Sequence, residues 1–242
     1  MGITLLLGLM VLIPVFIMTF VIAYKYREGN KQAKYSPELV GNLGAELIWW
    51  AIPIAIISVL SAIAWNSSHA LDPHKPLGIA GDPLTIQVVA LDWKWLFIYP
   101  GQGIASVNYF QFPVNTPVTF SITSDAPMNS FWIPQLGGQI YAMPGMSTSL
   151  HLIANKVGDY DGSSANISGA GFAGMRFTAA ASSSAQFADW VQTAKNDPHQ
   201  LDMNTYSQLA KPSQNNPVAL YSSVDNSLYD RVLVKYMGDG GS

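Results

Sequence analysis

The chain has 242 residues, of which 49% are hydrophobic and 11% are charged, whereas about a quarter of residues are charged in an average soluble protein. Its net charge of −3 does not indicate a nucleic-acid partner, and the absence of cysteine excludes disulfides, thiolate metal sites and cysteine nucleophiles. The apolar composition predicts membrane residence for part of the chain, and the length allows one sizeable domain besides.

Two uncharged stretches near the N-terminus predict a transmembrane hairpin within residues 1–66. Residues 3–24 and 47–65 are each long enough to cross a bilayer as a helix. A signal peptide is the alternative for the first stretch, but the run is too long and lacks a small-residue cleavage site. The intervening residues 25–46 form a short basic loop that should remain in the cytoplasm, with basic residues Lys25, Arg27, Lys31 and Lys34.

Glu46 stands at the cytoplasmic start of the second predicted span. A carboxylate at this position stabilises a helix start through the helix dipole. Carboxylates at membrane depth also mark proton routes, so Glu46 is a candidate for proton uptake. The position of Glu46 alone favours the helix-dipole role over proton uptake.

Residues 67–83 read as a linker rich in Ser, Pro and Gly. His69 and His74 are five residues apart within it. They could form a metal-binding pair, although exposed linker histidines are far commoner. We therefore predict no metal site in the linker.

From residue 84 the pattern changes to short β-like runs separated by Pro, Gly or Asn, which predicts a sandwich or barrel over residues 84–183. His151 falls in one of these runs and is interpreted as a strand residue. The predicted strands cover residues 84–90, 93–99, 107–112, 117–123, 130–133, 147–153 and 174–181.

After Ser184 the spacing of apolar residues becomes helical, and residues 184–242 are predicted to form a helical extension. Apolar side chains fall on one face of a first helix, and two further short helices are predicted at 201–209 and 228–237. The last five residues, 238–242, are expected to be a disordered tail.

Residues 169–174 match the glycine fingerprint of dinucleotide-binding proteins letter by letter. That fingerprint requires a preceding strand, a following helix and a later acidic residue, none of which the pattern provides here. We expect these glycines to form a tight loop between strands. No catalytic constellation stands out, and the acidic residues Asp92, Asp125, Asp159 and Asp161 are interpreted mostly as turn residues.

Two N-terminal spans followed by a β domain resemble subunit II of the haem-copper terminal oxidases. Within that family the chain is similar to the quinol-oxidising branch, specifically to subunit II of bo-type ubiquinol oxidases. The matching stretches cover nearly the whole chain, and include Lys34-Tyr35-Ser36-Pro37, His69-Ala70-Leu71-Asp72-Pro73, Asp92-Trp93-Lys94-Trp95 and Gln139-Ile140-Tyr141-Ala142-Met143. The resemblance implies a cupredoxin-like Greek-key barrel after the transmembrane hairpin, with the short helices at the C-terminal end.

Cytochrome c oxidases of this family hold two copper ions in that barrel. The resemblance places the positions of the five side-chain ligands on Asn129, Ser164, Ser168, Phe172 and Met175. The family spacing is therefore kept while four of the five ligating side chains are replaced. Copper pairs need bridging thiolates, which neutral hydroxyls and a phenyl ring cannot supply. We expect no metal, no other cofactor and no catalytic residue on this chain.

The resemblance implies a non-catalytic subunit of a proton-pumping ubiquinol oxidase in a bacterial inner membrane. The barrel would lie in the periplasm and brace subunit I, which would hold low-spin haem b, high-spin haem o or a, one copper and ubiquinone. Subunits III and IV and membrane lipid would be further partners, and cytochrome c and nucleic acid would not. Glu46 would then contribute to proton uptake. Trp93 and Trp95 are expected to pack the barrel against subunit I.

Two alternatives remain open at this point. One is a copper-bearing subunit II that accepts electrons from cytochrome c, and the other is a membrane-anchored periplasmic binding or sensor domain. The chain also lacks the lipid-bearing cysteine typical of the quinol branch. We expect either a start further upstream or a member without the lipid.

Overall fold

The computed structural model describes residues 2–32, 41–70 and 82–237. Contacts between residues divide the chain into two units, residues 1–72 and 73–242. Several sequence features lie outside the described residues: Lys34 and its motif through Pro37, residues 71–73, His74 and the tail 238–242.

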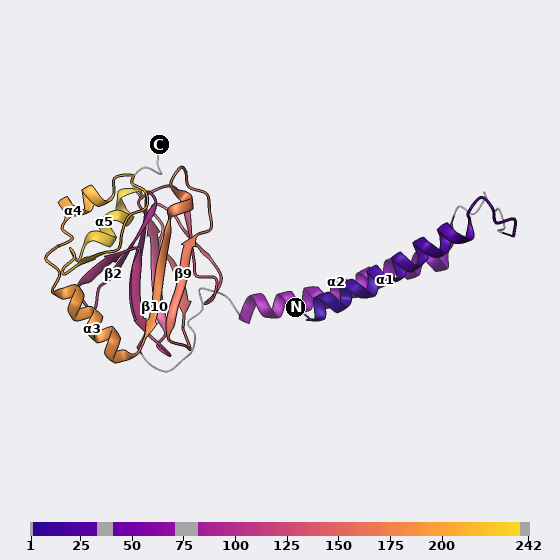
Figure 1. The fold of residues 1–242 in the computed structure, drawn as a ribbon, viewed down its shortest axis with the longest axis horizontal. Helices are drawn as coiled ribbons and strands as arrows, with labels where there is room; N and C mark the ends of the chain where they lie inside the picture. Colours follow the sequence, from indigo (N-terminus) through magenta and orange to yellow (C-terminus); the bar gives the residue numbers. More distant parts are fainter. Residues whose placement is uncertain (1, 33–40, 71–81, 238–242) are drawn as a thin grey trace. The chain divides into compact units, whose positions relative to one another are not determined.

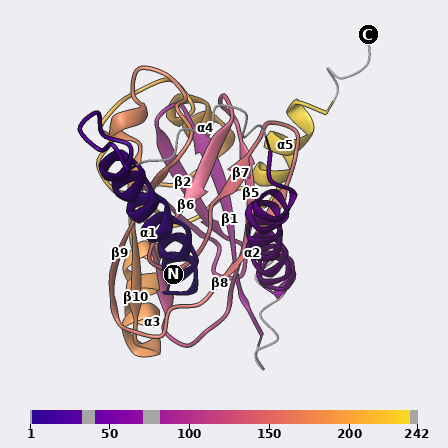
Figure 2. The ribbon, with the colours of Figure 1, turned by 90° about the vertical axis from the view of Figure 1, so that its right-hand side faces the viewer.

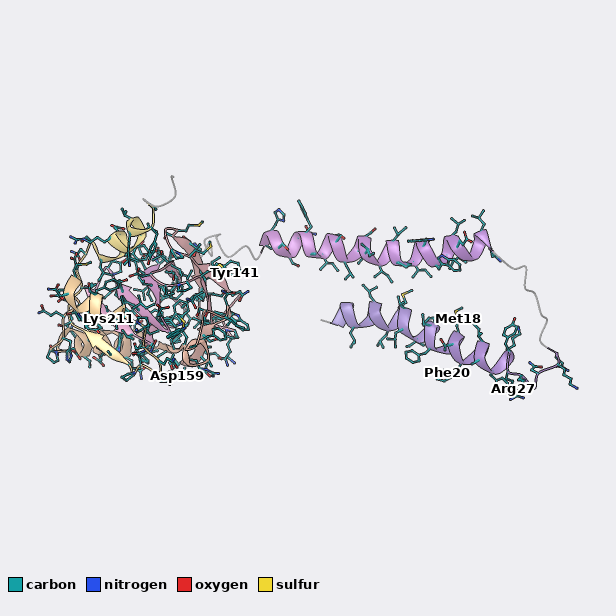
Figure 3. All side chains as sticks on the ribbon, turned by 90° about the horizontal axis from the view of Figure 1, so that it is seen from above. Met18, Phe20, Arg27, Tyr141, Asp159 and Lys211 are labelled. Atoms are coloured by element: carbon teal, nitrogen blue, oxygen red, sulfur yellow. The ribbon has the colours of Figure 1, made fainter. Side chains whose placement is uncertain are left out.

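The first unit consists of two long apolar helices, α1 (Gly2–Lys25) and α2 (Leu43–Ala70). Both pass the length and composition test for a membrane span, over Leu5–Lys25 and Glu46–Ala70. Most of their large apolar side chains are exposed, among them Met18 and Phe20 on α1, which is typical of helices whose natural surroundings are lipid or other helices (Figure 3). The two predicted apolar helices are confirmed, and α2 continues four residues into the predicted linker.

The second unit is built on two β-sheets that pack face to face (Figures 1 and 2). The six-stranded sheet has the order β11-β3-β2-β1-β5-β8, and the five-stranded sheet has the order β4-β10-β9-β6-β7. Most neighbours are antiparallel, but β1 pairs with β5 and β4 with β10 in parallel. The strands are β1 (Leu84–Leu91), β2 (Lys94–Tyr99), β3 (Ile104–Val107), β4 (Tyr109–Pro113), β5 (Val118–Ser124), β6 (Asn129–Trp132), β7 (Ile140–Ala142), β8 (Thr148–Leu152), β9 (Gly158–Ser164), β10 (Arg176–Ser182) and β11 (Ala219–Tyr221).

Aromatic rings from both sheets fill the space between the layers. Trp95 of β2 makes edge contacts with Phe131 of β6 and Phe177 of β10, and Phe131 stacks on Phe177 with ring centroids 5.0 Å apart. Each such buried ring removes a large apolar area from water, and aromatic pairs add about 0.5–1.5 kcal/mol beyond that burial. The predicted cupredoxin-like β domain is confirmed as a two-sheet structure with this core.

The C-terminal segment packs in two ways: its first helix adds Val191 and Ala194 to the core between the sheets, and the part from Leu201 onward covers the outer face of the six-stranded sheet. Its helices are α3 (Ser184–Lys195), α4 (Met203–Leu209) and α5 (Leu228–Lys235), and Figure 1 shows α4 and α5 lying over β2. A second apolar cluster joins side chains of this segment to the outward residues of three strands, and its members include Val89, Leu96, Ala105, Leu201, Tyr206, Leu228 and Val232. Strands β2 and β3 are therefore buried along their whole length.

The prediction of a purely helical extension after residue 184 is wrong in one respect. Residues Ala219–Tyr221 form β11, which pairs with β3 as an edge strand of the six-stranded sheet. The three predicted helices are confirmed within a few residues. The segment consequently belongs to the same unit as the barrel.

All seven predicted strands are confirmed with shifts of one or two residues at their ends, and β3, β7, β9 and β11 were missed. Strand β9 has the polar sequence GDYDGSS, and it forms because β10 and β6 pair with its two edges. Asp159 and Asp161 thus lie in a strand, which corrects their interpretation as turn residues. His151 is in β8 as expected, and its Nδ1 lies 3.1 Å from the Thr119 hydroxyl oxygen.

Candidate functional site

The structure brings together, at one end of the five-stranded sheet, two of the five positions that the resemblance assigns to copper ligands. Asn129 begins β6 and Ser164 ends β9, two strands that pair through Phe131 and Ser164. Both side chains are buried. The Ser164 hydroxyl donates to the Asn129 side-chain oxygen at 2.9 Å, and the Asn129 amide donates to the Pro127 carbonyl at 2.8 Å. The polar atoms of these two side chains are therefore hydrogen-bonded to each other and to the backbone.

Met175 and Phe172 lie at the far end of the loop that follows β9. Phe172 begins the short 3-10 helix η1 (Phe172–Gly174), and the Met175 amide donates to the Phe172 carbonyl at 3.0 Å. Met175 is buried in the core between the sheets, and its carbonyl accepts from the Ser164 amide at 3.3 Å. The loop is thus closed by backbone contact between its two ends.

Ser168 lies near the middle of the same loop. Its carbonyl accepts a hydrogen bond from the Trp93 indole nitrogen at 3.3 Å. Its hydroxyl is buried and has no hydrogen-bond partner among the described residues. No bond joins Ser168 to Asn129 or Ser164 in the described part of the chain.

Trp93 lies against the glycines of this loop. A Cβ atom added at Gly171 would collide with the indole ring, and one added at Gly169 would lie 3.0 Å from it. Gly169 also has a φ of 123°, a conformation that glycine adopts far more readily than other residues. The glycine run is therefore a tight loop between β9 and β10, as expected. A 3-10 turn ends it and strand β10 follows, in place of the α-helix that a dinucleotide site requires.

The expectation that Trp93 and Trp95 both pack the barrel against a neighbouring subunit is wrong for Trp95. Trp95 is fully buried between the two sheets of this chain, and its indole nitrogen has no partner among the described residues. Trp93 is partly buried by its own loop. Trp95 lies in β2 with its side chain between the sheets, whereas Trp93 lies in the turn before β2 with a φ of 63°.

The side chains at the five positions do not fit a pair of copper ions. Asn129 and Ser164 offer neutral, hard oxygen atoms that are already hydrogen-bonded, and Phe172 has no donor atom. Ser168 offers one hydroxyl, and only Met175 retains a soft donor. Copper pairs require soft bridging sulfur, which this set lacks.

Sequence reasoning missed a buried carboxylate four residues before Asn129. The side chain of Asp125 is 2% exposed. It accepts hydrogen bonds from Tyr206 at 2.7 Å, Lys235 at 2.6 Å and Tyr236 at 2.7 Å. Asp125 does lie in a bend, but its role is to join β5 to helices α4 and α5. No local sequence pattern indicated this contact, because the two tyrosines and the lysine are far from Asp125 along the chain.

Lys94 is a second buried charge that the sequence did not reveal. It is 1% exposed, and its Nζ donates to the Ser213 hydroxyl at 2.6 Å and the Lys211 carbonyl at 2.8 Å. Burial lowers the pKa of Lys94, and the charge of Asp92 partly offsets that effect. The ammonium group thus holds the segment between α4 and β11.

Glu46 lies in the first turn of α2 and is partly buried. Its amide donates to the Asn42 carbonyl at 2.9 Å. A Cβ added at Gly41 would lie 3.2 Å from its carboxylate oxygen, so the side chain folds back over the residues before the helix. This position suits both interpretations of Glu46, because a carboxylate here meets the positive end of the helix dipole and the edge of the candidate span.

No other metal site emerges from the parts of the chain that the structure describes. No group of three or more His, Asp or Glu side chains is arranged to hold an ion within them. The rings of His69 and Trp65 lie with their centroids 4.4 Å apart near the end of α2, and His74, which was not expected to form a metal pair with His69, lies outside the described residues.

Two family models match the chain. One is described as the periplasmic domain of cytochrome c oxidase subunit II and covers residues 104–181. The other is described as the COX aromatic rich motif and covers residues 195–240. The two matches fall on the two-sheet core and on the C-terminal segment that covers it.

Several curated proteins are similar over nearly the whole chain. Cytochrome bo(3) ubiquinol oxidase subunit 2 of Pseudomonas putida is 56% identical over 232 residues, which cover 96% of this chain and 74% of that protein. The same subunit of Pseudomonas aeruginosa is 54% identical over 97% of this chain and 71% of its own length. Among solved structures, the periplasmic domain of subunit II of cytochrome oxidase of Bradyrhizobium japonicum aligns with a TM-score of 0.46 and 27% identity, over 48% of this chain and 96% of that one.

Proposed function

Since the chain belongs to the family of ubiquinol oxidase subunit 2 within the haem-copper oxidases, we propose that it is a supporting subunit that carries no redox centre of its own. The oxidase it serves would oxidise ubiquinol, reduce dioxygen to water and move protons across the membrane. The observation that carries this proposal is the donor set at positions 129, 164, 168, 172 and 175. A chain without bridging sulfur there has no means of passing electrons from cytochrome c through copper.

The chain is a membrane-anchored protein with a periplasmic domain. We infer that both helices cross the bacterial inner membrane, with residues 26–42 on the cytoplasmic side. The basic residues of that stretch support this orientation, since basic loops are retained in the cytoplasm. The largely exposed apolar side chains of α1 and α2 would then meet lipid and the helices of partner subunits.

Subunit I would be the main partner, with subunits III and IV as further members of the complex. Low-spin haem b, a high-spin haem of type o or a, one copper and ubiquinone would all reside in subunit I. We assign these groups to subunit I because of the family, and because this chain lacks a suitable donor set at the positions that the resemblance assigns to copper ligands. The barrel would brace the periplasmic face of subunit I.

Glu46 would take part in proton uptake at the cytoplasmic surface. Its carboxylate lies in the first turn of α2, where the candidate span begins, and it folds back over the turn before the helix. A carboxylate at a membrane surface can collect protons and order water ahead of a buried path. If Glu46 only interacts with the helix dipole, loss of its carboxylate should affect structure and not turnover. A measurement of turnover therefore distinguishes proton uptake from the helix-dipole role.

The deciding experiment is mild detergent extraction of membranes through an affinity tag on this chain, followed by an optical spectrum and metal analysis. We expect a haem-bearing complex that oxidises ubiquinol, without the near-infrared band of a dicopper centre. A chain that purifies alone would support a sensor domain instead. A second and third copper atom per complex, together with oxidation of cytochrome c, would support the copper-bearing subunit and overturn the proposal.

A further inference from the structure

Two loops contain or adjoin the five positions that the resemblance assigns to copper ligands, and the C-terminal segment lies against both. We call residues 125–128 the first loop and residues 165–175 the second loop. Asn129 directly follows the first loop, and Ser164 directly precedes the second. We call residues 201–236 the clamp segment, because it donates hydrogen bonds to the buried Asp125 carboxylate of the first loop and lies against Gly174 of the second.

The first loop is held through Asp125. Its buried carboxylate accepts three hydrogen bonds from the clamp segment, two at the C-terminal end of α5 and one from α4. Its amide donates to the Ala90 carbonyl at 2.9 Å, which joins the loop to β1. A carboxylate that accepts three donors of this kind makes strong, short bonds, because one partner in each bond is charged.

The two loops are also bonded to each other. Ser164 donates to Asn129, and the Asn166 side chain donates to the Met128 carbonyl at 3.0 Å. The Ala165 amide donates to the Ser130 carbonyl at 3.1 Å. Movement of the first loop would therefore strain the start of the second.

The second loop has its own contact with the clamp segment. Lys94 holds residues 211–213 through the Lys211 carbonyl and the Ser213 hydroxyl. The Asn108 side chain donates to the Asn216 carbonyl at 2.9 Å. Between these anchors, the Asn215 side-chain oxygen lies so close to Gly174 that a Cβ added there would approach it to 2.5 Å.

We propose that the clamp segment replaces the cross-link that a metal would provide between the two loops, with Asp125 as its main anchor. This inference rests on the proposed function in one respect, namely that the loops hold no copper. Metal ligation joins loops that are distant in sequence, and it supplies folding free energy in doing so. In this chain, hydrogen bonds to Asp125 and the close approach of Asn215 to Gly174 connect one distant segment to both loops.

The apolar cluster beneath α4 and α5 does not by itself account for these contacts. That cluster attaches the clamp segment to the outer face of the six-stranded sheet. The bonds to Asp125, Lys94 and Asn108 lie outside it and are directional. Loss of one anchor should therefore loosen the loops while the sheet and its covering helices stay in place.

Hydrogen–deuterium exchange on the assembled, affinity-purified complex tests this inference. Asp125→Asn keeps the size of the side chain and removes its charge, whereas Asp189→Asn makes the same change on the exposed surface of α3. In Asp125→Asn we expect peptides covering residues 124–134 and 163–177 to exchange at least about tenfold faster, because a hydrogen bond to a charged group is lost. Peptides from β1 and β2 should be unchanged, and Asp189→Asn should match the wild type.

Uniform acceleration across the whole barrel would overturn the proposal, because it would show Asp125 to be a general stabilising residue. Unchanged exchange in both loops would overturn it as well. If Asp125→Asn does not assemble, Tyr236→Phe decides the question, since it removes one of the three donors and keeps the ring. Its loops should exchange faster than those of the wild type, and wild-type exchange would contradict the proposal. A different result, copper bound to the wild-type chain, would contradict the proposed function itself.

Discussion

The Ser164 hydroxyl donates to the Asn129 side-chain oxygen 2.9 Å away, so two of the positions that the resemblance assigns to copper ligands are bonded to each other. Both residues are buried, and each bond satisfies an atom that would otherwise lose its hydration without compensation. This contact explains how the two strand ends can stay together with neutral side chains.

Four substitutions together should restore copper binding: Asn129→His, Ser164→Cys, Ser168→Cys and Phe172→His. They would supply two thiolates and two imidazoles around Met175, the soft donor set that copper prefers. Copper analysis and a near-infrared spectrum of the purified complex would detect the centre. The matched control omits Ser168→Cys and should lack the two-copper spectrum. Absence of copper in the full variant would contradict the placement of these five positions.

Removal of the Glu46 carboxylate should lower turnover and proton uptake if the group collects protons. Glu46→Ala and Glu46→Gln should both lower them, because each removes the acid, whereas Glu46→Asp should retain part of the activity. Glu28→Ala removes the same charge from an exposed site in the loop after α1 and serves as the control. Oxygen consumption and proton uptake of the reconstituted complex are the measurements. Wild-type rates in Glu46→Ala would leave only the helix-dipole role.

Gly171→Ala should destabilise the domain through the Trp93 ring. Gly171 has a φ of −94°, which alanine can adopt, but the added Cβ would collide with the indole. Overpacking of this kind costs about 1–3 kcal/mol. Gly101→Ala is the control, since a Cβ there meets nothing within 4 Å. Urea unfolding of the full chain in detergent measures both.

The Trp93→Ala background checks the cause of that destabilisation. With the indole removed, Gly171→Ala should cost far less, because residues in contact show non-additive effects. An equal cost in both backgrounds would mean that the glycine is required for another reason.

Stability should fall as the pH rises above 10. Burial raises the pKa of Tyr99 far above its ordinary value of 10.0, and burial together with the Asp125 carboxylate raises the pKa of Tyr206. The unfolded chain would lose these protons near pH 10 while the folded chain keeps them, so each such tyrosine removes about 1.4 kcal/mol per pH unit there. Lys94 acts in the opposite direction, because burial lowers its pKa below 10.5 and stability then rises with pH up to that value.

Thermal unfolding of the full chain in detergent, recorded between pH 8 and pH 11, would show the loss as a falling midpoint above pH 10. Tyr206→Phe should reduce the slope in that region, whatever its effect at neutral pH. An unchanged slope in this variant would show that Tyr206 titrates alike in both states.

Local patterns were sufficient for most elements of the fold. The uncharged runs predicted both helices of the first unit, and alternating apolar residues between turn signals predicted seven strands. Strand β9 was missed because its residues are polar, and β11 because three residues give too little pattern against a helical background. In both cases pairing with distant strands, and not local preference, forms the strand.

By itself, the sequence determined the class of protein, since the two hydrophobic runs, the β-like runs after them and the stretches similar to the family can all be read along the chain. The tertiary structure alone decided where the buried charges go. Asp125 and its donors Tyr206, Lys235 and Tyr236 are separated by some eighty to one hundred and ten residues. Such a contact leaves no periodic trace in sequence, because burial and hydrogen bonding depend on which surfaces meet in space and not on spacing along the chain.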